Sequence, residues 1–396
     1  MSQKEGYINF EEYSQVGEPQ KAERAYAWST AIGLQAVDGL TVSQYLKDTA
    51  VRNIEGEISI DEARELIKTY YQTKTNREPD DEEKQEADKV SGNIAKIIAE
   101  QSFSFSVPTL ISFHRHIFEG VFKHAGQLRP YDITKKEWVL RGDTVLYGRS
   151  QDLRMALEYD IEQERQFDYS GLNMDQVVEH LAKFVSGIWQ IHPFREGNTR
   201  TTAVFTIKYL RSIGSDVTNH QFSMHSWYFR NALVRANYQN IAKDVQRDTR
   251  FLEQFFRNLL MGERNELRNR YMLVNPPEEL AVPASTTAST PASTPSNTPA
   301  STPSSNCSPF TTDNENILRL VKAIGHRQLS LKEMLAAVGL KDRKNFMEYS
   351  LTPAMSEGFV CLLYPDKPRH PRQKYLLTVK GSVLYNELTK DASKIN

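Results

Sequence analysis

The nine residues from His192 to Arg200 bring together side chains that are suited to phosphate chemistry. The imidazole of His192 can take a proton from a hydroxyl group. Glu196 offers a carboxylate of the kind that Mg²⁺ prefers. Gly197 and Asn198 tolerate unusual backbone angles, so that successive N–H groups can face an anion. Arg200 adds a planar guanidinium that matches phosphate oxygens. The stretch predicts a phosphate cradle with a base beside it.

Two apolar runs with helical character flank this stretch, at 177–191 before it and 201–213 after it. The second helix should begin near Thr199, where its first N–H groups and the positive end of its dipole would face a bound anion. An ordinary helix–loop–helix corner with a surface histidine is the alternative, and composition alone fits it about as well. The convergence of five residue types on one chemistry favours the cradle.

The stretch resembles the signature of Fic (Fido) domains, H-x-F-x-[DE]-G-N-G-R-x-x-R. Six of its eight defined positions match, namely His192, Phe194, Glu196, Gly197, Asn198 and Arg200. Two positions differ, because Thr199 replaces the second glycine and Ala203 replaces the second arginine. Upstream, residues 112–118 and 124–129 resemble the helix end and the AG..R turn that precede the signature in this family.

The resemblance implies a mainly-α protein with an all-helical Fic core and a small β-hairpin flap. It also implies an enzyme that transfers AMP from ATP to a hydroxyl side chain of a target protein, or of itself. His192 would be the catalytic base and Glu196 would bind Mg²⁺. The flap, at 133–147, would dock the target through Thr134, Lys135 and Lys136. The residues expected to bind the nucleotide phosphates are Arg195, Gly197, Asn198, Thr199 and Arg200.

Two acidic residues resemble the glutamate of the inhibitory helix found in Fic proteins, written [ST]-x-x-x-E-[GN]. Asp38 precedes Gly39 and Glu55 precedes Gly56, but neither motif keeps the hydroxyl residue. Each acid is also the kind of residue that ends a helix before a glycine cap. Without an arginine at 203, we expect an inhibitory acid to lack its usual ion-pair partner. A different arginine would then bind the distal phosphates, with Arg195 the nearest, or the donor would not be ATP.

The C-terminal segment, 313–396, is predicted to be a winged-helix (α+β) domain, with three helices followed by a hairpin. Lys and Arg exceed Asp and Glu in it by 14 to 9, a difference of +5. This excess would suit contacts with DNA phosphates. A role in protein contact or dimerisation is the alternative, and a homodimer fits that role. The residues expected to bind DNA are Arg343, Lys344, Asn345, Arg369 and Arg372.

Composition places these parts within one chain of 396 residues with a formal net charge of −1. We expect N-terminal helices at 1–108, the Fic core at 109–275, a Ser/Thr/Pro/Ala linker at 276–312 and the C-terminal domain at 313–396. The chain has no apolar run long enough for a membrane span, its start is polar, and it has only two cysteines. These features predict a cytoplasmic protein.

The departures at Thr199 and Ala203 leave a second function open. In it, the Fic core has become a nucleotide sensor with weak catalysis, and the protein is a DNA-binding regulator. Nucleotide binding without transfer to protein would distinguish this regulator from the transferase.

Overall fold

Helices dominate the structure, a computed structural model that describes residues 13, 18–75, 78–169, 171–215, 217, 219–275, 312–340, 342–363 and 373–393. The predicted mainly-α class is confirmed. None of the helices in this described part is long and apolar enough to cross a membrane. The predicted linker at 276–312 lies outside the described residues, except for Thr312.

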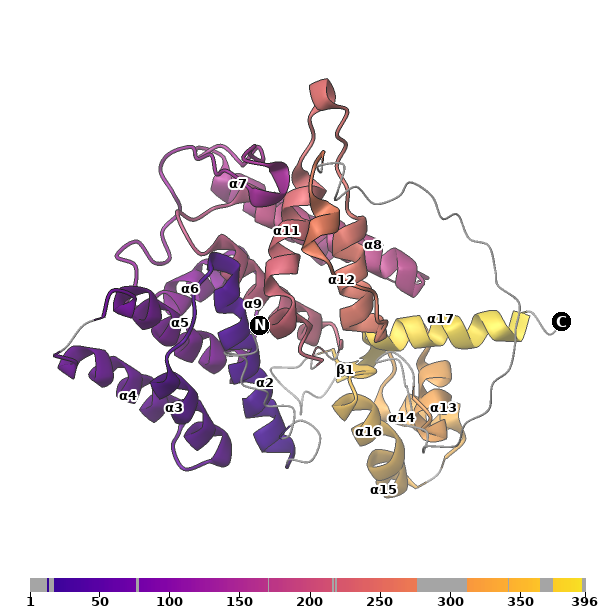
Figure 1. Ribbon diagram of the computed structural model, residues 1–396. Helices are drawn as coiled ribbons and strands as arrows, with labels where there is room; N and C mark the ends of the chain where they lie inside the picture. Colours follow the sequence, from indigo (N-terminus) through magenta and orange to yellow (C-terminus); the bar gives the residue numbers. More distant parts are fainter. Residues whose placement is uncertain are drawn as a thin grey trace, which may run out of the picture.

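The N-terminal helices form one side of the molecule (Figure 1). They are α2 (Pro19–Gly33), the 3-10 helix η1 (Leu34–Asp38), α3 (Gln44–Glu55), α4 (Ile60–Thr73) and α5 (Asp81–Ala99). Ser59 and Glu62 form the predicted capping box at the start of α4. The buried side chains of these helices belong to the same hydrophobic core as those of the helices that follow.

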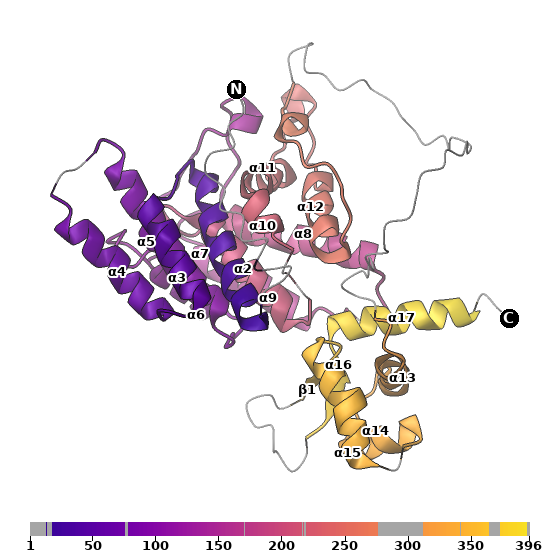
Figure 2. The same ribbon diagram turned by 60° about the horizontal axis from the view of Figure 1, so that its bottom comes forward.

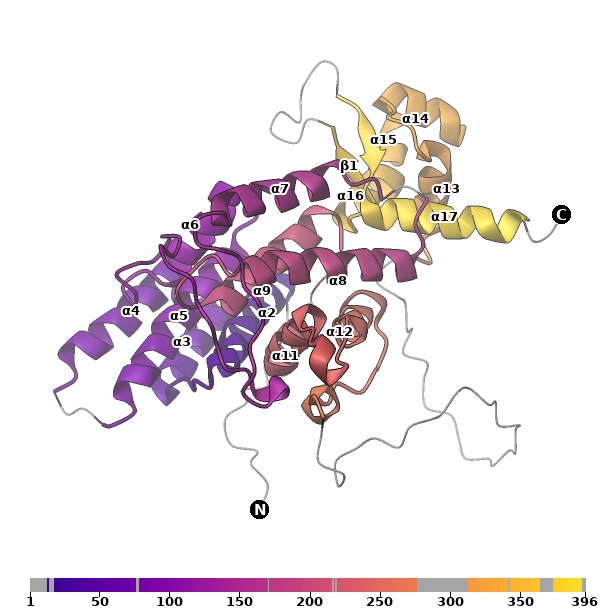
Figure 3. The same ribbon diagram turned by 90° about the horizontal axis from the view of Figure 1, so that it is seen from above.

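The rest of that core is built from α6 (Val107–Ile117), α7 (Leu153–Gln166), α8 (Met174–Ile191), α9 (Asn198–Ser212), α10 (Gln221–Met224), α11 (Ser226–Asn237) and α12 (Arg250–Met261), with the short 3-10 helices η2 (Trp138–Leu140), η3 (Ile241–Lys243) and η4 (Asn269–Met272). Figure 3 shows α8 and α9 side by side in the middle of these helices. Every residue of α9 from Asn198 to Leu210 is buried. Packing on all sides therefore fixes where the N-terminus of α9 lies.

Gly197 makes the turn into α9. Its φ of 72° lies in the left-handed region, where a side chain is strained. A Cβ atom at this position would also lie 2.1 Å from the ring of Phe118. Both the backbone conformation and the lack of space therefore require glycine.

The expected β-hairpin flap is a loop in the structure, with no strand assigned between residues 131 and 149. Its two extended arms are joined by η2 and closed by a backbone bond from Glu137 N–H to the Asp143 carbonyl, 2.9 Å. Other backbone groups bond elsewhere, because Lys135 N–H donates to Thr144 Oγ1 and Gly148 N–H to the Gln190 carbonyl. These bonds replace the ladder of a paired hairpin.

The C-terminal segment has the predicted order of three helical elements followed by two strands. It consists of α13 (Glu315–Ile324), α14 (Leu331–Val338), α15 (Arg343–Phe346), the π-helical turn η6 (Met347–Leu351), α16 (Thr352–Ser356), β1 (Val360–Leu362), β2 (Tyr375–Leu377) and α17 (Val379–Ser393). The strands are antiparallel, with Val360 opposite Leu377. Pro353 follows the π turn, which accommodates its missing N–H within the helical run.

This segment has a hydrophobic core of its own and packs beside the larger one (Figure 2). α17 lies at the junction, where Val383 belongs to the larger core and Asn386 Nδ2 donates to the Leu172 carbonyl over 3.2 Å. The backbones of Gly214 and Gly358 approach each other so closely that a Cβ on Gly214 would lie 2.4 Å from the Gly358 carbonyl oxygen.

Candidate active site

His192 follows α8 in a left-handed conformation, with φ of 50°, and is 3% exposed. Its Nδ1 lies 3.3 Å from the Trp189 carbonyl oxygen, which accepts a proton but cannot supply one. The proton therefore resides on Nδ1, and Nε2 is left as an acceptor that has no partner among the described residues. Burial, reinforced by the charge of Lys135, holds the pKa of His192 well below its usual value. The ring is neutral near pH 7, as a base must be.

Aromatic rings and a buried arginine hold His192 in place. The rings of Tyr147 and Trp189 lie 4.2 Å and 5.2 Å from the imidazole, centroid to centroid. Arg129, which is 1% exposed, donates from Nε to the His192 carbonyl over 2.8 Å and also bonds to the Gly148 carbonyl. Arg129 thus ties the base to the loop that carries Tyr147.

Tyr147 is fixed by a buried carboxylate. Its hydroxyl donates to Glu137 Oε1 over 2.9 Å, and Arg230 Nη1 lies 2.8 Å from Glu137 Oε2. Both Glu137 and Tyr147 belong to the loop predicted as the flap. This loop therefore builds one wall of the site, in addition to its expected role in docking a target.

The N-terminus of α9 opens into the site without a side-chain cap. The amide of Asn198 exchanges two hydrogen bonds with the backbone of Phe194, at 2.9 and 2.8 Å, so it shapes the loop and does not face a ligand. Thr199 Oγ1 accepts a hydrogen bond from Trp189 Nε1 over 2.9 Å. The free N–H groups and the dipole of α9 make this end of the helix attractive to an anion.

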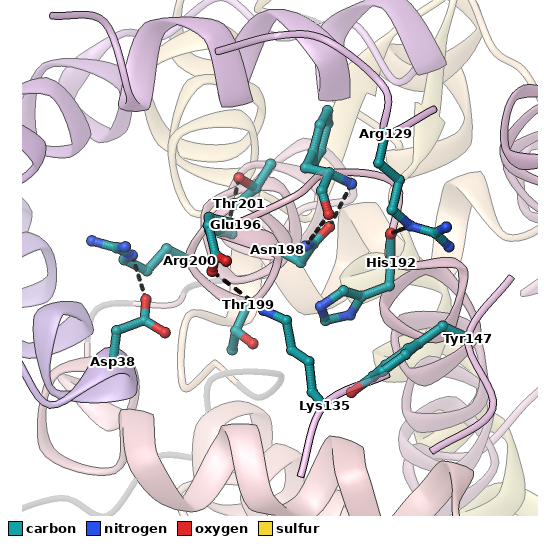
Figure 4. Close-up of polar contacts among 12 residues, drawn as sticks. Asp38, Arg129, Lys135, Tyr147, His192, Glu196, Asn198, Thr199, Arg200 and Thr201 are labelled. Atoms are coloured by element: carbon teal, nitrogen blue, oxygen red, sulfur yellow. Dashed lines mark hydrogen bonds and ion pairs between the residues drawn. The ribbon is translucent and has the colours of Figure 1, made fainter. Parts of the chain in front are cut away.

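Arg200 is 2% exposed and has three polar partners, one of which is shown in Figure 4. Its Nε lies 2.8 Å from Asp38 Oδ2, an ion pair whose N–H is not aligned for a hydrogen bond. Nη2 donates to Glu86 Oε1 over 2.9 Å and Nη1 to Gln35 Oε1 over 3.0 Å. The guanidinium also lies over the ring of Phe118. The predicted phosphate ligand is thus held by residues of η1 and α5.

Asp38 therefore lacks the usual partner at position 203, which is alanine, and pairs instead with Arg200, the first arginine of the signature. The physical reason is that Arg200 lies one turn earlier on the same helix, within reach of η1. Glu55, the other candidate inhibitory acid, pairs with Lys21 over 2.7 Å at the end of α3 and does not join this cluster.

Glu196 lies two residues before α9 in the chain, and its side chain is 57% exposed. Its carboxylate lies 3.3 Å from the ammonium of Lys135, a residue of the flap loop. Arg195, the expected substitute for a second arginine, lies over the ring of Tyr131 at 5.4 Å. The neighbouring flap residues Thr134 and Lys136 are exposed.

His114 supports the loop from behind. Its Nδ1 accepts a hydrogen bond from Gly126 N–H over 2.8 Å, so Nε2 carries the proton and donates to the Glu196 carbonyl over 3.1 Å. The ring stacks on Phe194 at 3.8 Å. Burial lowers the pKa of His114 to about 4. The neutral His114 thus holds the backbone of Glu196 in place through this hydrogen bond.

Sequence reasoning assigned no role to several residues of this site, namely Gln35, Glu86, Arg129, Glu137, Tyr147 and Arg230. Arg129 had a signal in its AG..R turn, whereas the others are isolated polar residues with no pattern of their own. Of the residues predicted to bind DNA, Arg343, Lys344 and Asn345 are exposed at the start of α15, where Asp342 caps the helix. Arg369 and Arg372 lie outside the described residues.

Comparison with known proteins identifies the two parts of the chain. Residues 104–210 match the Fic/DOC family, and residues 315–378 match "Filamentation induced by cAMP protein Fic-like, C-terminal domain". The chain is 28% identical over 123 residues to a probable protein adenylyltransferase Fic of Salmonella typhimurium and 33% identical over 101 residues to one of Escherichia coli K12. These matches cover 31% and 25% of this chain, and they span 58% and 46% of the relatives' own lengths.

Two solved structures are also similar. A Fic family protein from Desulfovibrio desulfuricans G20 has a TM-score of 0.39 and 18% identity, covering 90% of this chain and 87% of its own. The N-terminal Fic domain of an effector protein from Bartonella sp. AR 15-3 has a TM-score of 0.32 and 18% identity, covering 44% and 82%. The Fic/DOC family match and the two curated relatives do not support the alternative of a DNA-binding regulator. The chain therefore carries a Fic/DOC family domain at residues 104–210 and a Fic-like C-terminal domain at residues 315–378.

Proposed function

We propose that this protein transfers AMP from ATP to a hydroxyl side chain of a target protein. The observation that carries the proposal is Nε2 of His192, which has no partner among the described residues and belongs to a neutral, buried base beside the uncapped N-terminus of α9. The names of the curated relatives point to the same reaction. They match over only part of their length, so the activity rests on this site.

The reaction forms one P–O bond and breaks another. A Ser, Thr or Tyr hydroxyl of the target attacks the α-phosphorus of ATP in line, and pyrophosphate leaves with the electron pair of the broken bond. Nε2 of His192 takes the hydroxyl proton. The N–H groups at the start of α9 stabilise the negative charge on the phosphate, and Arg200 adds to this once Asp38 is displaced. Catalysis would come mainly from positioning and charge.

The residues present fit Mg²⁺ as the ion that accompanies the nucleotide. Glu196 is a single, largely exposed carboxylate at the N-terminus of α9, and Mg²⁺ commonly binds to one or two carboxylates together with phosphate oxygens. Bound there, the ion would neutralise phosphate charge. One protein ligand is enough for this role, because the nucleotide and water supply the others.

Asp38 would act as a brake on this site. It holds Arg200, the only cation in the first two turns of α9, and so competes with phosphate for it. In the proposed mechanism of inhibition, the carboxylate of Asp38 therefore competes with the phosphates of ATP for Arg200.

The test uses full-length protein, cell lysate as a source of targets, and ATP labelled at either the α- or the γ-phosphate. The wild type and Asp38→Asn should incorporate the α label, and His192→Ala should lose incorporation while keeping its unfolding midpoint. Mass spectrometry of the protein itself should show an added AMP mass if it is its own target. Incorporation of only the γ label would show phosphate transfer instead, and incorporation that survives His192→Ala would refute the assignment of the base.

A further inference from the structure

Few cations face the phosphates of a nucleotide in this site. The first two turns of α9 contain one basic residue, Arg200, and position 203 is a fully buried alanine. Arg200 is already neutralised by the carboxylates of Asp38 and Glu86. A nucleoside triphosphate carries several negative charges, which must be matched as water is excluded. The site therefore needs a positive charge from outside α9.

Lys135 is placed to supply that charge. Its ammonium lies 3.3 Å from the Glu196 carboxylate, and Figure 4 shows it between the side chains of Glu196, Thr199 and His192. The Lys135 side chain is 29% exposed, so it remains in contact with solvent and can exchange partners. Its backbone is fixed, because its N–H donates to Thr144 Oγ1 over 3.2 Å.

The present partner of Lys135 also points to this role. Glu196 is the residue that we propose would hold Mg²⁺, which would neutralise phosphate charge there. The Lys135 ammonium, 3.3 Å from that carboxylate, therefore lies beside the proposed position of the phosphate oxygens. Arg195 has the same charge, but its guanidinium lies over the ring of Tyr131.

We propose that Lys135 is a phosphate ligand, a cation that the flap loop contributes to the binding of the nucleotide's distal phosphates. The inference rests on the proposed function, since it assumes a nucleotide at the N-terminus of α9. It assigns the flap a second task besides docking a target. Nucleotide affinity would then depend on the position of the flap.

The experiment measures binding by calorimetry, separately from transfer, with ATP, ADP, AMP and adenosine as probes. It uses the full-length protein with Asp38→Asn, which leaves Arg200 available to phosphate, and compares Lys135→Met, Lys135→Arg and Lys136→Met in that background. Lys136 is the matched control, because it is the next residue of the same loop and is exposed. Lys135→Met should weaken ATP and ADP binding by about tenfold or more, as expected for loss of a charge-assisted contact.

In the same variant, adenosine and AMP should bind almost unchanged. Lys135→Arg should retain most of the ATP affinity and Lys136→Met all of it. Equal weakening of adenosine and ATP would overturn the proposal, because it would show a general disturbance of the loop. Unchanged ATP binding with reduced transfer to a protein target would also overturn it and leave Lys135 as a docking residue. Failure of all variants to transfer AMP would refute the proposed function without affecting the binding comparison.

Discussion

Replacing Asp38 by Asn should release Arg200 and strengthen nucleotide binding. The substitution removes the negative charge but keeps the shape of the side chain, so the packing of η1 is retained. Arg200 would keep its contacts with Glu86 and Gln35, which orient its guanidinium. Its Nε edge, now facing Asp38, would become available to a phosphate oxygen.

The geometry sets the size of the effect. Two unit charges 2.8 Å apart attract by about 6 kcal/mol at an effective dielectric constant of about 20, before any cost of desolvation. The net value is smaller, because the Asp38 side chain is 38% exposed and the N–H of Arg200 is not aligned with it. A hydrogen bond to a charged group is worth about 1.5 kcal/mol. If Arg200 makes such a contact with ATP once Asp38 no longer holds it, ATP should bind roughly tenfold more tightly.

Calorimetry measures the affinity for ATP, and incorporation of label from α-labelled ATP measures transfer to protein. Glu55→Gln is the matched control, since it neutralises the other candidate inhibitory acid, which pairs with Lys21 away from the site. The unfolding midpoint should fall only slightly, because the net loss is that of one charged contact, about 1.5 kcal/mol. The reasoning is refuted if Asp38→Asn leaves both ATP affinity and incorporation unchanged, or if Glu55→Gln raises them equally.

Three further predictions concern the base and its support. Tyr147→Phe keeps the ring against His192 but loses the bond to Glu137, so it should reduce kcat several-fold. Tyr147→Ala should reduce kcat by about two orders of magnitude, with little change in KM for ATP. Equal effects of the two substitutions would contradict a role of Tyr147 in positioning the base. Because the pKa of His192 lies well below 6.5, AMP transfer should not lose its base as the pH falls to 6, and a rate profile with its acid limb at 6.5 or above would contradict this. His114 is held neutral, with a pKa of about 4 in the folded protein, whereas the unfolded chain takes up a proton near pH 6.5. The free energy of unfolding should therefore fall as the pH drops from 6.5 to 4, by up to about 3 kcal/mol, in denaturant titrations.

The sequence was sufficient to predict the parts of the fold and of the site that depend on neighbouring residues in the chain. The helices on either side of the signature, the cap at Ser59 and the turn at Gly197 follow from short-range patterns of apolar, polar and glycine residues. The Asp38–Arg200 pair was not predictable, because 162 positions separate its members and only tertiary packing brings η1 to α9. The absence of a paired flap was not predictable either, because it depends on tertiary contacts. The Lys135 N–H donates to the Thr144 hydroxyl and not to a backbone carbonyl across the loop.

The packing of η1 limits how the brake can be released. Leu34 and Val37 precede Asp38 in the short helix and are 0% and 1% exposed, so withdrawing the whole segment would expose both. That exposure costs about 1.5–3 kcal/mol for each side chain, more in total than the roughly 1.5 kcal/mol attributed to the Asp38 contact. Rotation of the half-exposed Asp38 side chain frees Arg200 without this cost. If Asp38 is the brake proposed above, its release should therefore take place at the level of one side chain, with phosphate oxygens competing for Arg200 while η1 stays packed.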